Sequence, residues 1–173
     1  MILERLPYAR EDVWKVLPQG MSIAELGVWE GAYSEYILAN ANPSKLYLVD
    51  IWSDSFPMTM SNTKPLENYT NVMGRYHDDD RVTVWRGDTI EFLNHIDEID
   101  CVYIDSSHTY EQTVQELDAC LGKVKKYIMG HDYIDIFGVP KAVNEFIQKH
   151  NLKCVLTNEV DEMWPSFIIC VGE

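Results

Sequence analysis

The chain has 173 residues, of which 46% are hydrophobic and 24% are charged. A chain of this length and composition buries about two thirds of its unfolded surface, so we predict a folded globular protein and not a disordered one. Fourteen Lys and Arg residues stand against twenty-eight Asp and Glu residues, which gives a net charge of −14. Because this charge repels phosphate groups, we expect neither nucleic acid nor an anionic membrane as a partner.

The sequence carries no pattern of membrane insertion or secretion. It has no run of eighteen apolar residues, and its first residues lack the basic and apolar segments of a signal peptide. Four widely separated cysteines form no C-x-x-C pair, which is typical of reduced thiols in a cytoplasmic protein. We therefore expect a cytoplasmic location and buried, unpaired thiols at Cys101, Cys120, Cys154 and Cys170.

Short apolar runs alternate with helical patterns along the chain. The runs cover residues 23–26, 46–49, 82–85, 101–104, 127–129, 153–156 and 167–171. This alternation predicts a parallel sheet with helices on both faces. No helical pattern separates the last two runs, so we expect these two strands to pair antiparallel. Residues 1–173 are predicted to form a single domain, with a leading helix region at 1–20 and the core at 21–173.

The first strand leads into a glycine turn, with Glu25, Gly27 and Gly31 in the pattern E-x-G-x-x-x-G. Glycine permits a tight turn at the end of the strand, and we expect Gly31 to let a ligand approach the next helix. A dinucleotide fold needs its second glycine two residues after the first, and here that position is Trp29. The pattern favours a nucleotide-type crevice, and a plain strand–helix turn is the alternative.

Two acids follow the next two strands. Asp50 stands nineteen residues after Gly31, at a position where an acid can accept both hydroxyls of a ribose. Asp88 is suited to accept from an adenine amine and to cap the helix over residues 89–95. For each acid, a structural role in a turn or cap alone is the alternative.

Two further motifs place titratable side chains at the ends of later strands. The first contains Asp105 and His108, and the second contains His131 and Asp132. Open α/β sheets bind their ligands at the carboxyl ends of the strands, and histidine can take a proton from an attacking hydroxyl. The alternative is that the histidines only anchor the following helix or pack under the rim of the sheet.

The order of these motifs resembles that of class I S-adenosylmethionine-dependent methyltransferases. The D-x-x-H-x-Y and H-D-Y motifs resemble the small-domain family that includes macrocin-type sugar O-methyltransferases, over about residues 22–171. The resemblance implies a doubly wound, Rossmann-like α/β sheet of seven strands, in the order 3-2-1-4-5-7-6 with strand 7 antiparallel. It also implies that the methionine part of the cofactor contacts Glu25, Gly27 and Gly31, its ribose Asp50 and its adenine Asp88.

Related sugar and catechol-type enzymes hold a divalent ion at the positions of Asp105 and Asp132. Mg²⁺ suits such oxygen ligands and would lower the pKa of a substrate hydroxyl. In this chain His131 precedes Asp132, and no adjacent second carboxylate supplies a third ligand, although Asp135 is near. The alternative is therefore a catalytic site of Asp105, His108, His131 and Asp132 that works without a metal.

We predict an enzyme that transfers a methyl group from S-adenosylmethionine to a hydroxyl of a small molecule such as a sugar. One alternative is an NAD-dependent oxidoreductase, favoured by the spacing of Asp50 and opposed by Trp29. Another is a non-catalytic domain that binds S-adenosylmethionine or S-adenosylhomocysteine. We expect the acceptor pocket to come from the leading helix, a lid over residues 52–64, the hairpin around Trp164, or a second subunit of a homo-oligomer.

Overall fold

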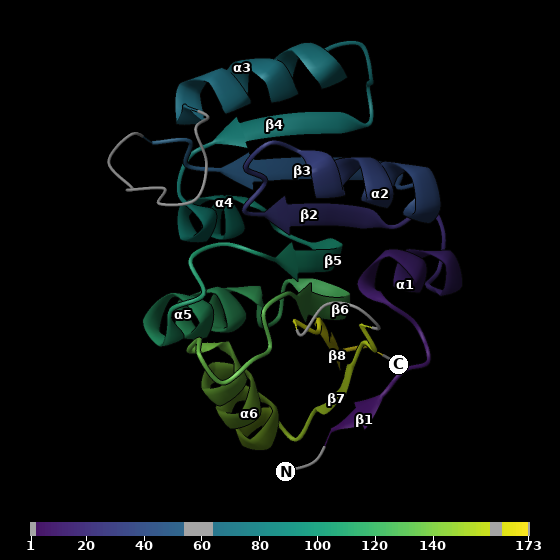
Figure 1. Ribbon diagram of the computed structural model, residues 1–173, viewed down its shortest axis with the longest axis vertical. Helices are drawn as coiled ribbons and strands as arrows, with labels where there is room; N and C mark the ends of the chain where they lie inside the picture. The colour runs from purple at the N-terminus through teal and green to yellow at the C-terminus, as the bar shows by residue number, and fades with distance from the viewer. Residues whose placement is uncertain (1–2, 54–63, 160–163, 173) are drawn as a thin grey trace.

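The computed structural model describes residues 3–53, 64–159 and 164–172. Within them the chain forms one eight-stranded sheet with helices on both faces (Figure 1). The strands are β1 (Glu4–Arg5), β2 (Ser22–Leu26), β3 (Lys45–Asp50), β4 (Val82–Arg86), β5 (Ile99–Ile104), β6 (Val124–Gly130), β7 (Lys153–Leu156) and β8 (Phe167–Cys170).

The sheet order is β1-β7-β8-β6-β5-β2-β3-β4. Strands β2 to β8 are the seven that the sequence predicts, and read from β4 they follow the predicted order 3-2-1-4-5-7-6. The last strand is also antiparallel, as expected, because β8 runs against both β6 and β7. The prediction lacked β1, which pairs parallel with β7 through Glu4 and Val155. Two residues are too few to display an alternating pattern, so this edge strand has no signal of its own.

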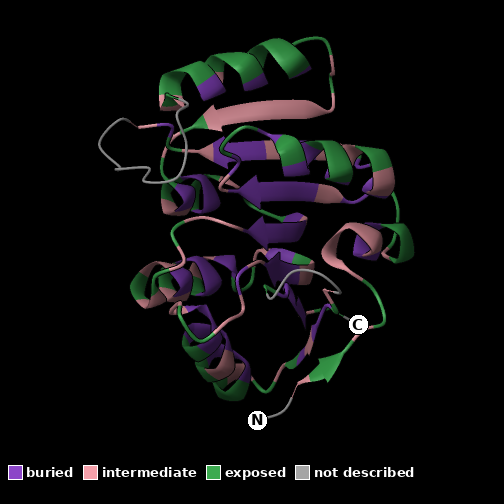
Figure 2. Ribbon diagram, viewed as in Figure 1, coloured by how far each residue is buried: buried purple, intermediate pink, exposed green. Residues whose placement is uncertain are grey.

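Six helices lie in the described residues, and each face of the sheet has its own set of three. The helices are α1 (Arg10–Val16), α2 (Ala32–Ala41), α3 (Pro65–Tyr76), α4 (Thr89–His95), α5 (Tyr110–Cys120) and α6 (Val139–His150). Helices α1, α2 and α3 share one hydrophobic cluster with the sheet, and α4, α5 and α6 share the other. Figure 2 shows the buried residues concentrated in the central strands between these layers. No helix of the described ranges is long and apolar enough to cross a membrane.

The local helix signals behave as their chemistry predicts. The side chain of Thr109 accepts a hydrogen bond from the backbone N–H of Gln112 and so caps α5. Pro140 lies in the first turn of α6, and Asn151 ends that helix in the left-handed conformation. The caps at Thr109 and Pro140 mark where the loops that follow β5 and β6 end.

The cysteines are free, and three of them are buried as predicted: Cys101, Cys120 and Cys154. The expectation is wrong for Cys170, which is exposed. Cys170 is the last residue of β8, where the strand leaves the core. The cytoplasmic location stays a prediction.

Candidate active site

The predicted glycine turn joins the end of β2 to the backbone that follows β5. Gly27 has a φ of +91°, and a Cβ there would lie 2.1 Å from the carbonyl oxygen of Asp105. No side chain fits at that distance, so only glycine permits this close approach. The N–H of Gly27 donates to the carbonyl of Val49 on β3. The turn is therefore held between the two strands that flank β2.

Gly31 lies against a neighbouring helix. It has a φ of +76° and precedes α2, but a Cβ there would meet the Val72 side chain at 3.1 Å and Arg75 at 3.4 Å, both on α3. The glycine makes room for the neighbouring helix, and its contact with a ligand stays a prediction. Its N–H already donates to the carbonyl of Val28. Gly31 therefore shapes the turn through its backbone conformation.

Asp50, at the end of β3, fixes the same turn from the other side. Its Oδ2 atom accepts hydrogen bonds from the backbone N–H groups of Val28 and Trp29, at 2.9 and 2.8 Å. Its Oδ1 atom accepts one from the N–H of Trp52. A carboxylate oxygen can accept two hydrogen bonds, so Oδ1 keeps capacity for one more donor.

Asp88 caps α4, which is one of the two roles predicted for it. Its Oδ1 atom accepts hydrogen bonds from the N–H groups of Ile90 and Glu91, at 2.9 and 3.0 Å. A carboxylate at the start of a helix also interacts favourably with the helix dipole. Both cap bonds use the same oxygen of Asp88.

Glu25, on β2, is a buried acid. Its carboxylate accepts a hydrogen bond from the hydroxyl of Ser34 on α2. Burial disfavours the charged form and raises the pKa of Glu25 to about 8, although the bond from Ser34 opposes this rise. At neutral pH, Glu25 therefore mostly keeps its proton.

Two histidines share the carboxylate of Asp132. Nδ1 of His108 lies 2.9 Å from Oδ2 of Asp132, and Nδ1 of His131 lies 2.9 Å from Oδ1. Burial lowers the pKa of His108, but the bond to Asp132 outweighs it, and the net shift is upward. Burial raises the pKa of Asp132, but the two histidines outweigh it, and that pKa falls well below its usual range.

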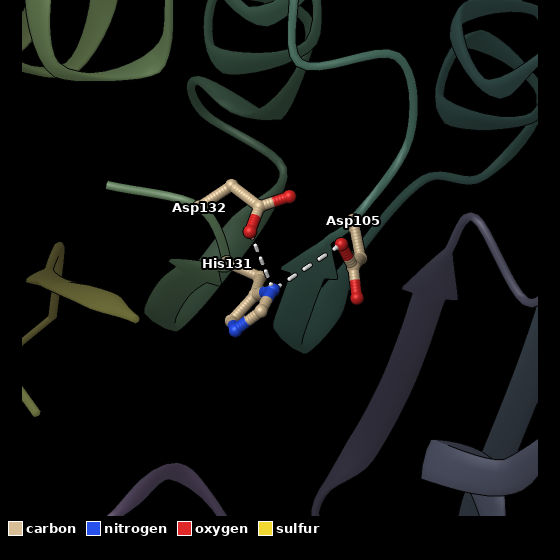
Figure 3. A group of neighbouring side chains, drawn as sticks. All are labelled: Asp105, His131 and Asp132. Atoms are coloured by element: carbon tan, nitrogen blue, oxygen red, sulfur yellow. Dashed lines mark ion pairs between the residues drawn. The ribbon is translucent and has the colours of Figure 1, made fainter. Parts of the chain in front are cut away.

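Asp105 completes this cluster from the end of β5. Its Oδ1 atom lies 3.8 Å from Nδ1 of His131, and Figure 3 shows the three side chains converging from adjacent strand ends. Each of the residues Asp105, His131 and Asp132 offers one ligand atom, and these three atoms lie within 4.8 Å of one another. Burial raises the pKa of Asp105, and the nearby histidines oppose that rise. The third donor of this group is His131, and Asp135 is not part of it.

Comparison with known proteins identifies the family of the chain. The family described as methyltransferase domain matches residues 24–133, which is more than half of the chain. The chain belongs to this methyltransferase family. No curated protein matches it by sequence.

Solved structures support the same class at the level of the fold. A precorrin-6y methyltransferase from Geobacter metallireducens has a TM-score of 0.65 and 15% identity, over 94% of this chain and 86% of that chain. The B. subtilis tRNA methyltransferase TrmK has a TM-score of 0.66 and 15% identity, over 97% and 67%. TrmK of M. capricolum, solved with S-adenosylhomocysteine, has a TM-score of 0.64 and 17% identity, over 93% and 66%. The protein is a class I S-adenosylmethionine-dependent methyltransferase.

The likeness to TrmK corrects one prediction from composition. We excluded nucleic acid as a partner because of the net charge of −14, but a tRNA methyltransferase shares this fold over 97% of the chain. Net charge describes the whole surface, whereas an acceptor meets only one part of it. The exclusion of nucleic acid is therefore wrong.

Two features of the methyltransferase site have no counterpart in the predicted set. Glu116 on α5 is fully buried and accepts hydrogen bonds from Thr89 at 2.6 Å and Ser106 at 2.7 Å. These partners directly follow Asp88 and Asp105 in the chain. The contacts are tertiary, so no local pattern around Glu116 announces them. Arg10 on α1 is the second feature, and its guanidinium lies over the ring of Tyr33.

An aromatic row borders His108. The rings of His108 and Phe137 are 5.1 Å apart, and those of Phe137 and Trp164 are 5.5 Å apart and nearly perpendicular. Trp164 is the hairpin residue that the sequence analysis placed at the acceptor pocket. The predicted lid largely falls on residues 54–63, which lie outside the described residues.

Proposed function

We propose that this methyltransferase methylates a hydroxyl of a small polyhydroxylated molecule such as a sugar. The observation that carries the proposal is the carboxylate of Asp132, which two imidazoles share beside Asp105 at the ends of β5 and β6. Such a group can accept a proton from a hydroxyl and stabilise the charge that results. The resemblance to macrocin-type sugar O-methyltransferases points to the same acceptor class.

We assign the cofactor to the neighbouring half of the crevice. Glu25, Gly27 and Gly31 would border the methionine part, with the glycines acting through the shape of the turn. Asp50 would accept from the ribose with the remaining capacity of Oδ1, and Asp88 would accept from the adenine amine. TrmK of M. capricolum, of similar fold, was solved with S-adenosylhomocysteine, which supports this class of cofactor.

His108 is our candidate for the general base. Its Nδ1 atom faces Asp132, which orients the ring and leaves Nε2 to take a proton. As the acceptor oxygen attacks, the new carbon–oxygen bond forms while the carbon–sulfur bond breaks. The sulfonium becomes a neutral thioether, and the hydroxyl proton moves to Nε2. Asp132 then stabilises the imidazolium, in the way that a buried acid supports a catalytic histidine.

The group of Asp105, His131 and Asp132 also fits a divalent cation. Two carboxylates with one imidazole nitrogen suit Mn²⁺ or Zn²⁺ better than Mg²⁺, which prefers oxygen ligands. A bound cation would lower the pKa of an acceptor hydroxyl. To ligate through Nδ1, His131 must give up its contact with Asp132 and present an unprotonated nitrogen.

The test is transfer of tritium from methyl-labelled S-adenosylmethionine to a panel of sugars and other polyols. We expect Asp132→Asn and Asp105→Asn to abolish transfer, and the exposed Asp97→Asn to leave it unchanged. If a cation is required, a chelator stops transfer and Mn²⁺ or Mg²⁺ restores it. Transfer by the Asp105→Asn, Asp132→Asn double variant at the parental rate would contradict the proposed site.

RNA is the second candidate acceptor, and the likeness to a tRNA methyltransferase favours it. The same assay with unmodified tRNA in place of the polyols distinguishes the two. If tRNA becomes labelled and the polyols do not, the acceptor is RNA and the small-molecule proposal is wrong.

A further inference from the structure

Arg10, the first residue of α1, lies over the first turn of α2. Its guanidinium carbon is 4.9 Å from the ring centroid of Tyr33, which stands two residues after Gly31. The Tyr33 hydroxyl accepts a hydrogen bond from the indole of Trp14 at 2.8 Å. The backbone N–H of Arg10 donates to Glu159 at 3.1 Å. These contacts hold the guanidinium at the end of the glycine turn.

The side chain of Arg10 is mostly buried, with 21% of it exposed. Its Nε atom donates to Glu11 at 3.0 Å. That bond and the aromatic contact leave the outer edge of the guanidinium, with Nη1 and Nη2, without a hydrogen bond to any residue in the described ranges. A buried guanidinium with two unused donor atoms is a binding group for a planar anion.

Two acids, Glu11 and Asp105, act on the charge of Arg10. Burial lowers the pKa of Arg10, but its acidic and phenolic neighbours raise it by more, so the guanidinium stays charged. The positive charge of Arg10 in turn favours the charged forms of Glu25 and Asp105. This end of the crevice therefore combines acids from β2 and β5 with one fixed cation from α1.

The methionine part of S-adenosylmethionine carries three charges: an ammonium, a sulfonium and a carboxylate. The charge of Asp105 suits the two cations, but it repels the carboxylate. We propose that Arg10 binds the carboxylate of the cofactor through Nη1 and Nη2. This inference rests on the proposed cofactor site, and it assigns to α1 a part in cofactor binding that the sequence analysis did not.

The test combines two ligands with two forms of the protein. S-adenosylhomocysteine and its decarboxylated analogue share the adenosine, the sulfur and the amine, and they differ only in the carboxylate. Calorimetry should find that the analogue binds the parent protein about 10- to 100-fold more weakly, as expected for loss of a charge-assisted pair. The Arg10→Met variant should bind S-adenosylhomocysteine more weakly by a similar factor, and it should bind the two ligands about equally. Arg10→Lys should recover part of the difference.

The matched control is Lys15→Met on the same helix, because Lys15 is exposed and pairs with Asp12. This variant should keep the full discrimination between the two ligands. Binding of 5′-methylthioadenosine, which lacks the whole amino-acid part, should be unchanged in Arg10→Met and reports that the crevice is intact.

Equal binding of the two ligands by the parent protein would overturn the inference, whatever the variants do. Discrimination that persists in Arg10→Met would also overturn it. If the parent binds neither S-adenosylhomocysteine nor 5′-methylthioadenosine, the proposed function fails instead.

Discussion

The imidazole of His108 and the carboxylate of Asp132 meet across two loops, with Nδ1 2.9 Å from Oδ2. Both residues have a positive φ, +54° for His108 and +56° for Asp132. This backbone conformation is uncommon outside glycine and carries an energetic cost, which proteins tolerate most often at functional sites. Two residues with this backbone conformation therefore meet in one ion pair of the site.

The bond to Asp132 should control the protonation of His108. Asp132→Asn removes the charge that raises the pKa of His108, so the ring should titrate at a lower pH in the variant. Because the pKa is raised in the folded state, the pair stabilises the fold most fully below about pH 6.5 and less as pH rises through the folded value. Histidine ring signals in NMR titrations measure the shift. Asp135→Asn is the exposed control, and an unshifted His108 in Asp132→Asn would refute the coupling.

Glu25 should make stability fall as pH rises. Its pKa is raised to about 8 in the fold, so between about pH 4.5 and 8 the unfolded chain loses a proton that the folded chain keeps. Above pH 8 the buried charge costs up to about 5 kcal/mol. Glu25→Gln carries no such charge, so its melting temperature relative to the parent should rise from pH 4 to pH 9. A difference that is independent of pH would count against a buried, protonated Glu25.

Gly27 and Gly122 offer a matched pair of glycines with positive φ. A Cβ at Gly27 would lie 2.1 Å from the oxygen of Asp105, whereas a Cβ at Gly122 has nothing within 4 Å. Gly122→Ala should lower the free energy of unfolding by about 1 kcal/mol, because only the unfavourable backbone conformation destabilises the variant. Gly27→Ala should cost about 3 kcal/mol or more and displace the turn. Urea unfolding compares them, and equal losses would mean that the contact with Asp105 is unimportant.

Glu116 should matter far more than its neighbour Glu111 on the same helix. Glu116→Ala leaves the buried hydroxyl of Thr89 and the half-buried hydroxyl of Ser106 without their acceptor, which should cost about 3 kcal/mol in the free energy of unfolding. Glu116→Gln keeps one acceptor oxygen and should cost about 1 kcal/mol. Glu111→Gln, at an exposed position, should change stability by about 0.5 kcal/mol or less. Similar losses for Glu116→Ala and Glu111→Gln would show that the network contributes little.

The sequence predicts the strand order and the edge of the sheet at which Asp105 and Asp132 meet. The strands themselves follow from hydrophobic periodicity, and their order is what the resemblance to class I methyltransferases implies. The shared edge follows from the rule that the carboxyl ends of parallel strands lie together. The sequence also identifies the two glycines, but it does not reveal that Gly31 lies against α3. Position along the chain reveals that a residue stands at a turn, but not what the turn packs against.

Arg10 and Glu116 lay beyond prediction for a common reason. Arg10 depends on the packing of α1 on α2, and Glu116 on hydrogen bonds to residues ten and twenty-seven positions away. Neither residue stands in a local motif. A buried charge that is explained only by distant partners becomes visible once the chain is folded.

The most direct test of the account is calorimetric titration of the parent protein and Asp50→Ala with S-adenosylhomocysteine and with NAD. We predict micromolar binding of S-adenosylhomocysteine by the parent protein, about −8 kcal/mol, and no binding of NAD. Asp50→Ala should weaken the binding of S-adenosylhomocysteine by about 2–3 kcal/mol, because the substitution removes both a hydrogen-bond acceptor for the ribose and the anchor of the turn. Binding of NAD without binding of S-adenosylhomocysteine would contradict the account.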